Sequence, residues 1–285
     1  MRAAYLGPEG TNSHEALVTA GLEAEYLGFP TVGAVVAAVH SGIADRGLVP
    51  IENSREGGVG ATLDALVFDA PDVMIVGELV HRVSYCLAAA EPIAPDEVRT
   101  VHSHPQATGQ CARFLAEQLP GASVVSAAST ADAVRAVADG GSLPGTPPHA
   151  AICTRHAAAL YGATLLAESI EDDADNATRF AWIARAEDAA VGRDVPSPRH
   201  KTALVFWGGG DLAPGWLVAC LTEFSSRAIN LTRIESRPRR VGLGHYMFFC
   251  DLEGAASNPE VAAAIAGLRD HCESVRVLGS FPAST

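Results

Sequence analysis

The sequence lacks several features that mark whole classes of protein. Its N-terminus has no charged segment followed by an apolar one, so no secretory signal is evident, and no apolar run is long enough to span a bilayer. The six cysteines are scattered without a CxxC pair, which indicates reduced thiols and not a disulfide framework or zinc site. Long runs of like charge are missing, and the net charge of −13 argues against nucleic acid as a partner. We therefore expect a cytoplasmic protein with no membrane or nucleic-acid partner.

The composition is that of an ordinary globular protein. Hydrophobic residues make up 48% and charged residues 19% of the 285 positions, enough for two or three domains with a sizeable core. An anionic small molecule is still a candidate ligand for this acidic chain. Its binding site must then be locally positive.

The first two-thirds of the chain alternate short apolar runs with stretches of helical character. This alternation predicts an α/β domain with a largely parallel sheet. The expected strands are residues 2–6, 46–51, 73–80, 82–90, 99–103, 123–127, 150–154, 163–169 and 181–184. The expected helices are residues 13–21, 61–68, 105–119, 130–140 and 155–162, with a loop over 140–149.

A change of rhythm follows residues 186–201, which lack periodicity, carry two prolines and form the best candidate for a linker. Beyond this segment we expect strand, helix, strand, strand, helix and strand, the βαββαβ order of a ferredoxin-like domain. The corresponding ranges are 202–208, 216–228, 229–237, 244–254, 258–272 and 275–281. The chain is therefore expected to be a large α/β unit, a linker and a small α+β unit.

Two Gly-rich loops follow expected strands, at the edge of an α/β sheet where ligands gather. In LGPEGTNSHEA (6–16), the Thr11 hydroxyl and backbone N–H groups would suit a carboxylate or phosphate, although a capped turn explains the same residues. In VPIENSREGGVGAT (49–62), Glu52, Asn53 and Ser54 precede three glycines, beginning at Gly57, that let a ligand approach the backbone. This second loop has more polar groups than a connection needs, which favours a functional role.

Two further polar loops are candidates for the same edge. In HSHPQATGQC (102–111) no third metal ligand is spaced near the histidines, so His104 and Gln106 are expected either to contact a ligand or to cap a helix. In DDADNATRF (172–180), Thr178 offers a hydroxyl and Arg179 a fork that fits a carboxylate, unless Arg179 pairs with an acid of the protein. Phe180 is expected to wall the pocket or to join the core.

Taken together, these loops resemble the prephenate dehydratase family. The matching motifs are GPEGT (7–11), VPIENSREGGV (49–59), SHPQA (103–107) and DNATRF (175–180). INLTRIESRP (229–238) and YMFFCDLEG (246–254) resemble the phenylalanine-sensing ACT domain of that family. The resemblance covers nearly the whole chain in the right order.

The resemblance implies a particular division of the chain. Residues 1–185 would form a catalytic domain like a type 2 periplasmic binding protein, with one lobe of about 1–77 and 170–185 and a second of about 78–169. Residues 186–201 would link it to an ACT domain over 202–285. No chorismate mutase helices precede the large domain, so a monofunctional enzyme is expected.

The resemblance also implies the chemistry. Prephenate would lose CO2 and its ring hydroxyl to give phenylpyruvate in phenylalanine biosynthesis, without a metal or other cofactor. Thr178 would be the essential threonine, and either Thr178 or Glu52 would donate the proton. Substrate-binding residues would be Thr11, Asn53, Ser54, Gly57, His104, Gln106, Asn176, Arg179 and Phe180.

Regulation follows from the same resemblance. L-Phenylalanine is expected to bind between paired ACT domains of a homodimer or homotetramer, so that activity is allosterically controlled. The expected effector residues are Gly215, Trp216, Leu217, Asn230, Leu231, Glu235 and Ser236. Trp216 departs from the family, which has a small residue there, and we expect it to reshape the effector's pocket. Arogenate dehydratase and a catalytically silent amino-acid sensor are the alternative functions.

Overall fold

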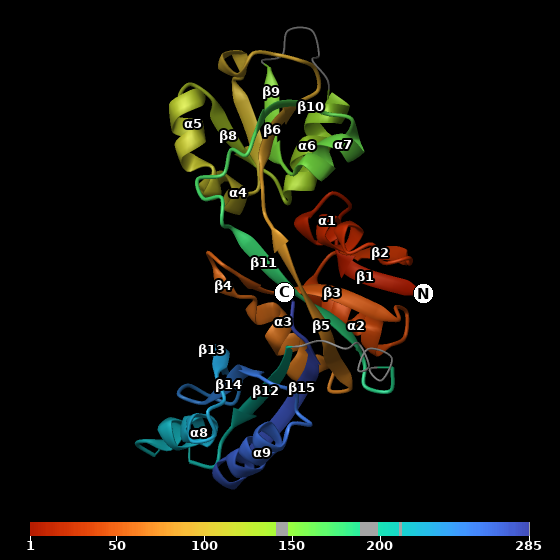
Figure 1. Cartoon of the computed structure of the whole chain (residues 1–285). Helices are drawn as coiled ribbons and strands as arrows, with labels where there is room; N and C mark the ends of the chain where they lie inside the picture. Colours follow the sequence, from red (N-terminus) through yellow and green to blue (C-terminus); the bar gives the residue numbers. More distant parts are fainter. Residues whose placement is uncertain (141–147, 189–198, 211–212, 285) are drawn as a thin grey trace.

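Three β-sheets follow one another along the molecule in the computed structural model (Figure 1). The structure describes residues 1–140, 148–188, 199–210 and 213–284. Most of the expected loop 140–149 and of the expected linker 186–201 therefore lies outside the described residues. No helix of the described ranges is both long and apolar enough to cross a membrane.

The first sheet lies in the middle of the molecule and has the order β2-β1-β3-β11-β5, with β4 paired to β3. Its strands are β1 (Arg2–Leu6), β2 (Glu25–Phe29), β3 (Arg46–Asn53), β4 (Gly57–Gly58), β5 (Val73–Arg82) and β11 (Ala177–Arg185). The helices beside it are α1 (Asn12–Thr19), α2 (Val32–His40) and α3 (Gly60–Asp64), the last continuing into a π-helical turn (Ala65–Asp69).

The second sheet, at the top of Figure 1, has the order β10-β6-β9-β7-β8. Its strands are β6 (Cys86–Ala89), β7 (Thr100–Ser103), β8 (Ser123–Ser126), β9 (His149–Cys153) and β10 (Thr164–Glu168). The helices around it are α4 (Pro105–Gln110), α5 (Ala112–Gln118), α6 (Thr130–Gly140) and α7 (Arg155–Tyr161), and a 3-10 turn spans Pro95–Glu97.

The expectation of a largely parallel sheet is wrong, because both sheets are mixed. β1 runs parallel to β2 and β3, whereas β11 is antiparallel to both β3 and β5. The cause is the path of the chain, which leaves the first sheet on β5 and returns to it on β11, so the two neighbours run in opposite directions. In the second sheet β6 is likewise antiparallel to β9 and β10.

The third sheet has the order β13-β14-β12-β15 and, with two helices, forms the small C-terminal unit. Its elements are β12 (His200–Trp207), α8 (Trp216–Ser225), β13 (Leu231–Pro238), β14 (Tyr246–Glu253), α9 (Pro259–His271) and β15 (Ser274–Pro282). This is the βαββαβ order that the sequence predicts.

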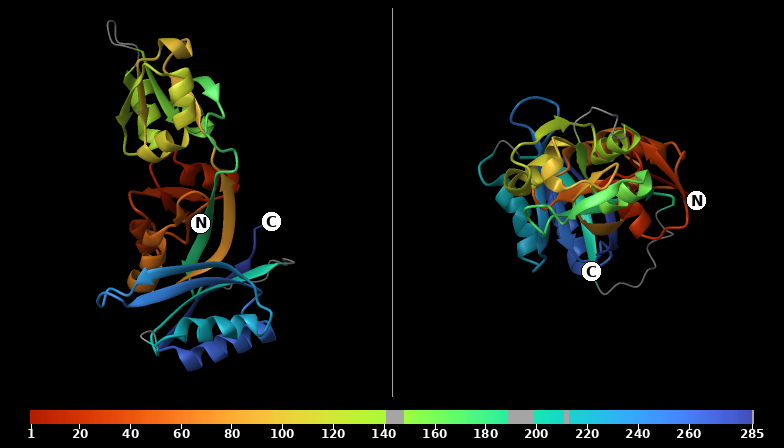
Figure 2. Two further views of the ribbon diagram at one scale, coloured as in Figure 1. Left: turned by 90° about the vertical axis from the view of Figure 1, so that its left-hand side faces the viewer. Right: turned by 90° about the horizontal axis from the view of Figure 1, so that it is seen from above.

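The small C-terminal unit buries both faces of its sheet. Alternate residues of β12 divide between two cores: Leu204 and Phe206 pack under α8 and α9, whereas Val205 packs with Leu66 and Ile75 of the large unit. Figure 2 shows the two helices on the side of the sheet that faces away from the rest of the molecule. The other face is therefore a docking surface against the first sheet and its helices.

Candidate active site

A cleft of about 630 Å³ lies between the first and second sheets of the large unit. Loops and helix ends from both sides line it, and β3 and β11 contribute its floor. Its lining includes seven residues that the sequence singled out: Thr11, Asn53, Gly57, His104, Gln106, Thr178 and Phe180. The four loops therefore converge on one cavity.

Thr178 and Asn53 sit side by side on the floor of this cleft. They are directly paired residues of the antiparallel strands β11 and β3, and both are more than nine-tenths buried. The Asn53 Nδ2 donates a hydrogen bond to the Thr178 Oγ1 at 3.0 Å. Because that oxygen already accepts from Asn53, the Thr178 hydroxyl proton is available for a different acceptor.

The Asn53 side chain is held in one orientation by the loop that follows it. Its Oδ1 accepts from the backbone N–H groups of Arg55 at 2.9 Å and Glu56 at 3.2 Å. With the oxygen so engaged, the amide nitrogen must face Thr178 and Asn176, whose Oδ1 lies 3.2 Å away. The asparagine is thus a fixed donor towards the threonine.

Asn176 and Ser54 support this arrangement without lining the cleft. Asn176 Nδ2 donates to Gln110 Oε1 at 2.8 Å, which ties β11 to the second sheet's helices. The Ser54 hydroxyl accepts from the Ala177 backbone N–H at 3.0 Å. The sequence predicts that both residues bind substrate, but neither is among the residues that line the cavity.

Helix N-termini supply the positive potential of the cleft. Thr11 caps α1, with its Oγ1 accepting from His14 N at 3.3 Å, and Ser129 does the same at the start of α6, accepting from Asp132 N at 2.9 Å. The first backbone N–H groups of a helix lack intrahelical partners and favour anions. Among the described residues that line the cleft there is no lysine or arginine.

Four more of the residues that the sequence singled out, His104, Gln106, Phe180 and Gly57, also line the cleft. His104 caps α4, since its Nδ1 accepts from Gln106 N at 3.3 Å, and both residues also line the cavity. Phe180 lines the cleft and is almost fully buried, so it is both pocket wall and core. Gly57 has a φ of +81°, which favours glycine in the turn beneath the cavity.

Glu52 and Arg179 lie on the other side of the same strands, outside the cleft lining. Neighbouring strand residues point to opposite faces, so a cleft-facing Asn53 and Thr178 turn Glu52 and Arg179 away. The Nε of Arg179 lies 3.0 Å from Glu52 Oε2. The structure therefore gives Arg179 protein carboxylates as partners, which is the alternative that the sequence left open, and it gives Glu52 an ion pair with Arg179.

Several cleft residues were missed by sequence reasoning. These are Ser129 and Thr130 at the start of α6, Tyr85 between the two sheets, and Glu56, the carboxylate of the lining. The signal for Ser129 was present, because Ser129 and Asp132 have capping-box spacing before a well-predicted helix. Burial raises the pKa of Tyr85 to about 12, so its hydroxyl is protonated.

The expected effector residues of the small C-terminal unit do not converge within one chain. A hollow of about 180 Å³ is lined by Gly215, Trp216 and Leu217 together with residues of β14. The Trp216 indole packs against Phe206 and Phe248, and its Nε1 donates to the His271 carbonyl at 2.7 Å. The other four expected residues, Asn230, Leu231, Glu235 and Ser236, are not part of this lining.

No group of three or more His, Cys, Asp or Glu side chains suited to a metal occurs in the described part of the chain. His102 and His149 form a pair at 3.2 Å between β7 and β9, without a third ligand. All six cysteines are free thiols.

Fold and site thus define an α/β protein with a cleft between two mixed sheets, floored by a threonine–asparagine pair and suited to an anion. The model of the family "Prephenate dehydratase" matches residues 3–188. A prephenate dehydratase of Mycobacteroides abscessus is 39% identical over 100% of this chain and 91% of its own length. The chain belongs to the prephenate dehydratase family.

Two solved structures match with the same TM-score of 0.84. One is prephenate dehydratase from Arthrobacter aurescens in complex with L-Phe, 35% identical, covering 99% of this chain and 90% of that one. The other is GqqA, described as a novel type of quorum quenching acylase, 29% identical, covering 100% of this chain and 98% of that one. Overall shape alone therefore does not separate a dehydratase from an acylase.

Proposed function

We propose that the cleft binds prephenate and that the protein converts it to phenylpyruvate for phenylalanine biosynthesis, as its family membership indicates. The bond between the ring and the carboxylate attached directly to it breaks and releases CO2, and the electrons of that bond enter the ring. The C–O bond to the ring hydroxyl breaks, and the departing oxygen takes a proton and leaves as water. The ring becomes aromatic, so the driving force is intrinsic to the substrate.

The observation that carries this proposal is the hydrogen bond from Asn53 to Thr178. It fills an acceptor position of the Thr178 oxygen and leaves the proton free to point into the cleft. A hydroxyl so directed stabilises negative charge that develops on the departing oxygen. Thr178 is therefore the preferred donor over Glu52, which is engaged with Arg179 on the opposite face.

The substrate's two carboxylates fit a cleft whose donors are mainly helix ends and hydroxyls. The N-termini of α1 and α6 come from opposite sides, so each can hold one negative group. Partial charges of this kind are fixed in place before the substrate arrives and need no reorganisation. Closure of the two sheets around the substrate would keep water from the reacting ring.

An acylase would need a nucleophile activated by a base. Thr178 Oγ1 accepts a hydrogen bond from an amide, and among the described residues no histidine or carboxylate is hydrogen-bonded to it. Such a threonine suits proton donation better than attack on a carbonyl. The likeness to GqqA therefore adds no second candidate function here.

The direct test is to incubate the purified protein with prephenate and to measure phenylpyruvate, with arogenate assayed in parallel. We expect phenylpyruvate from prephenate. Phenylalanine formed from arogenate with a higher kcat/KM would identify an arogenate dehydratase, and no product from either would identify a silent binding protein.

The domain division belongs to the same proposal. Residues 1–185 would form a catalytic domain like a type 2 periplasmic binding protein, and residues 202–285 an ACT domain that binds L-phenylalanine. The βαββαβ order and the dehydratase structure with L-Phe support this. Isothermal titration of L-phenylalanine into wild type should show binding. Binding only by Trp216→Ala would show that the indole occludes the site.

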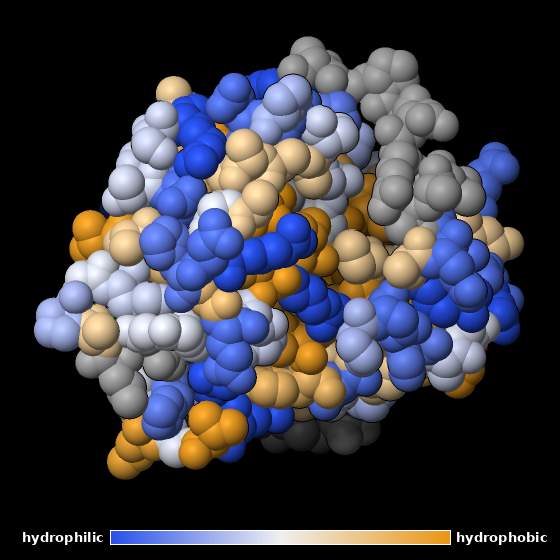
Figure 3. Space-filling view, turned by 90° about the horizontal axis from the view of Figure 1, so that it is seen from below, coloured by the Kyte–Doolittle hydropathy of each residue, from blue (hydrophilic) through white to orange (hydrophobic). Residues whose placement is uncertain are grey.

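A homodimer or homotetramer is the expected assembly, built by pairing of the small C-terminal units. β13 is an edge strand of its sheet, and Ile234, Tyr246 and Val218 near it are exposed apolar residues. Seen from below, where this unit lies, the surface carries orange apolar residues among polar ones (Figure 3). Light scattering that gives a monomer at micromolar concentration would contradict this assembly.

A further inference from the structure

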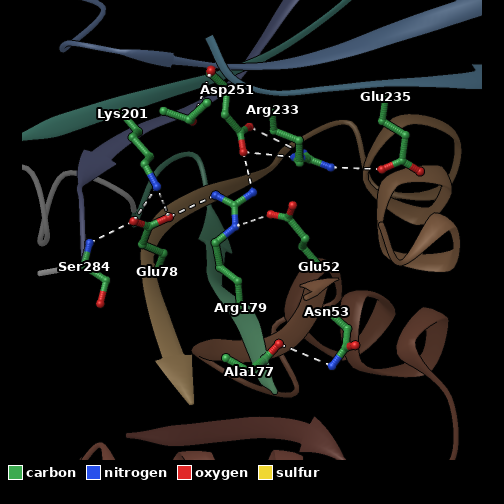
Figure 4. Close-up of polar contacts among 11 residues, drawn as sticks. Glu52, Asn53, Glu78, Ala177, Arg179, Lys201, Arg233, Glu235, Asp251 and Ser284 are labelled. Carbon is green, nitrogen blue, oxygen red and sulfur yellow. Dashed lines mark hydrogen bonds and ion pairs between the residues drawn. The ribbon is translucent and has the colours of Figure 1, made fainter. Parts of the chain in front are cut away.

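The Arg179 guanidinium is surrounded by three carboxylates from three strands (Figure 4). Nε lies 3.0 Å from Glu52 on β3, and Nη1 donates to Glu78 on β5 at 3.0 Å. Nη2 donates to Asp251 on β14, which belongs to the small C-terminal unit. One side chain therefore joins three strands across the boundary between the two units.

Further charges from the small C-terminal unit complete this cluster. Lys201 Nζ donates to both oxygens of Glu78, at 3.0 and 3.2 Å. Arg233 Nε donates to Asp251 at 3.0 Å, and Arg233 Nη1 reaches Glu235 at 3.2 Å. These seven side chains form what we call the Arg179 cluster: Glu52, Glu78, Arg179, Lys201, Arg233, Glu235 and Asp251.

The centre of the Arg179 cluster is buried, and each of its charges faces at least one opposite charge. The Asp251 and Glu78 side chains are 1% and 2% exposed, and that of Arg179 is 12% exposed. Burial alone would raise the pKa of Asp251, but Arg233 and Arg179 hold it below its ordinary value. Charges buried to this degree interact strongly, and loss of one member leaves its partners uncompensated.

Two adjacent residue pairs connect this cluster to the cleft. On β3, Glu52 belongs to the cluster and Asn53 to the cleft floor; on β11, Arg179 belongs to the cluster and Thr178 to the cleft floor. Thr178 pairs with Asn53 and Arg179 with Glu52 in the register of the two strands. The contacts of the guanidinium and the threonine hydroxyl therefore act on adjacent residues of one strand.

We propose that Arg179 is a positioning residue, which uses Asp251 of the small C-terminal unit to fix Thr178 and Asn53 in their reactive geometry. This inference rests on the proposed function of Thr178. The small C-terminal unit then is a structural part of the active site, because its Asp251 holds the guanidinium next to Thr178 in place. A substrate ligand would instead need Arg179 to face the cleft, which it does not line.

A second contact links the small C-terminal unit to the same cavity and does not involve Arg179. On β13, Glu235 lies against Gly58 so closely that a Cβ on that glycine would overlap its carboxylate. Gly58 belongs to the loop that lines the cleft. The small C-terminal unit thus contacts both the floor strands and the glycine loop of the cavity.

The structure also offers a matched control. Arg276 crosses the same boundary and donates to the carbonyls of Leu66 at 2.9 Å and Pro71 at 2.7 Å. Its hydrogen bonds reach the carbonyls of Leu66, Ala70, Pro71 and Val73, which belong to neither β3 nor β11. Arg276→Gln therefore weakens docking without touching the floor strands, and its kcat should stay within about twofold of wild type.

The test is a double-mutant cycle on the full-length protein, with kcat and KM for prephenate measured for Arg179→Gln, Asp251→Asn and the double variant. We expect each single variant to lose at least about tenfold in kcat with KM within about threefold, the pattern of a geometric defect. The double variant should be no more than about twofold worse than the more damaged single variant. Additive losses, or near-wild-type kcat in both singles, would overturn the proposal.

A KM at least about tenfold higher in Arg179→Gln with kcat retained would also overturn it, because that pattern belongs to a substrate ligand.

Glu52→Gln keeps the test decisive if the buried variants fail to fold, since the Glu52 side chain is 37% exposed. We expect it to lose between about twofold and tenfold in kcat with an unchanged pH profile. A loss of about a hundredfold or more together with a lost limb of the pH profile would make Glu52 the proton donor and overturn the proposal. Wild-type kcat would overturn it too. An inactive wild type would instead refute the proposed function itself.

Discussion

The two faces of β3 and β11 differ in every chemical respect. The cleft face carries an amide and a hydroxyl, Asn53 and Thr178, with helix ends around them. The opposite face carries Glu52 and Arg179 within a cluster of buried charges. The comparison teaches that these two strands carry their strong charges on the face away from the cleft, where they fix geometry, and that the groups offered to an anion in the cleft are hydroxyls and helix ends.

Such a division suits a reaction on a dianion. A free guanidinium in the cleft would bind substrate and transition state about equally, which lowers KM without raising kcat. A hydroxyl directed at the leaving oxygen acts mainly when charge develops there. The charged cluster on the opposite face of the strands then holds that hydroxyl rigidly in position.

The largest effect is expected from the cleft face. Thr178→Ala should lower kcat by about 10²–10⁴-fold while KM and the melting temperature stay close to wild type, because the hydroxyl acts in the transition state. Thr178→Ser is the matched control and should keep kcat within about tenfold. Steady-state rates of phenylpyruvate formation check both variants, and comparable turnover in Thr178→Ala would remove the threonine from the chemistry.

A smaller effect, on stability and KM, is expected where the glycine loop of the cleft contacts the small C-terminal unit. Gly58→Ala should lower the free energy of unfolding by about 1–3 kcal/mol and raise KM several-fold, because the new methyl group overlaps Glu235. Gly109→Ala is the control, since its Cβ would meet nothing within 4 Å. Thermal denaturation and steady-state kinetics measure both.

The double variant Gly58→Ala/Glu235→Ala separates this contact from a general effect of the loop. Removal of the carboxylate should restore most of the lost stability and KM. If the double variant is no better than Gly58→Ala, contact with the small C-terminal unit is not the cause.

The smallest expected effect is on the pH dependence of stability, and it comes from a contact between the two sides of the cleft. His14 Nδ1 on α1 lies 3.1 Å from His156 Nε2 on α7 and accepts from Gly10 N, also at 3.1 Å. Burial first, and then His156, lowers the pKa of His14, while Glu9 and Glu15 act in the opposite direction. The folded state therefore prefers neutral His14.

The sign of the pH effect follows from this preference. Because the folded-state pKa lies below the ordinary 6.5, the contribution is complete above pH 6.5 and is lost as the pH falls below it. Melting temperatures at pH 7.5 and 5.5 should differ less in His14→Gln than in wild type. An equal difference in both proteins would show that this histidine does not contribute.

Much of this organisation could be predicted from the sequence. The βαββαβ order of the small C-terminal unit and the full extent of α6 follow from periodicity, and the convergence of four polar loops follows from a general rule of α/β sheets. Four elements were missed: the two-residue strand β4, the 3-10 turn Pro95–Glu97, β2, and the valine-rich helix α2, whose apolar residues match a buried strand as well as a helix.

The placement of Glu52 and Arg179 was wrong for a definable reason. The DNATRF segment was taken as a loop entering a strand, whereas β11 already begins at Ala177, so side chains alternate from there. Alternation alone would have separated Thr178 from Arg179. The identity of Asp251 as a partner, 72 residues further along the chain, depends on how the two units dock and has no local signal.

Substrate affinity in the absence of turnover tests the separation of the two faces most directly. Calorimetric titration of prephenate into Thr178→Ala and into Thr178→Ala/Arg179→Gln measures binding without conversion to product. We predict dissociation constants that agree within about threefold, because Arg179 does not face the cleft. Binding weakened by about tenfold or more, which corresponds to about 1.4 kcal/mol, would contradict the account and make Arg179 a ligand of the substrate.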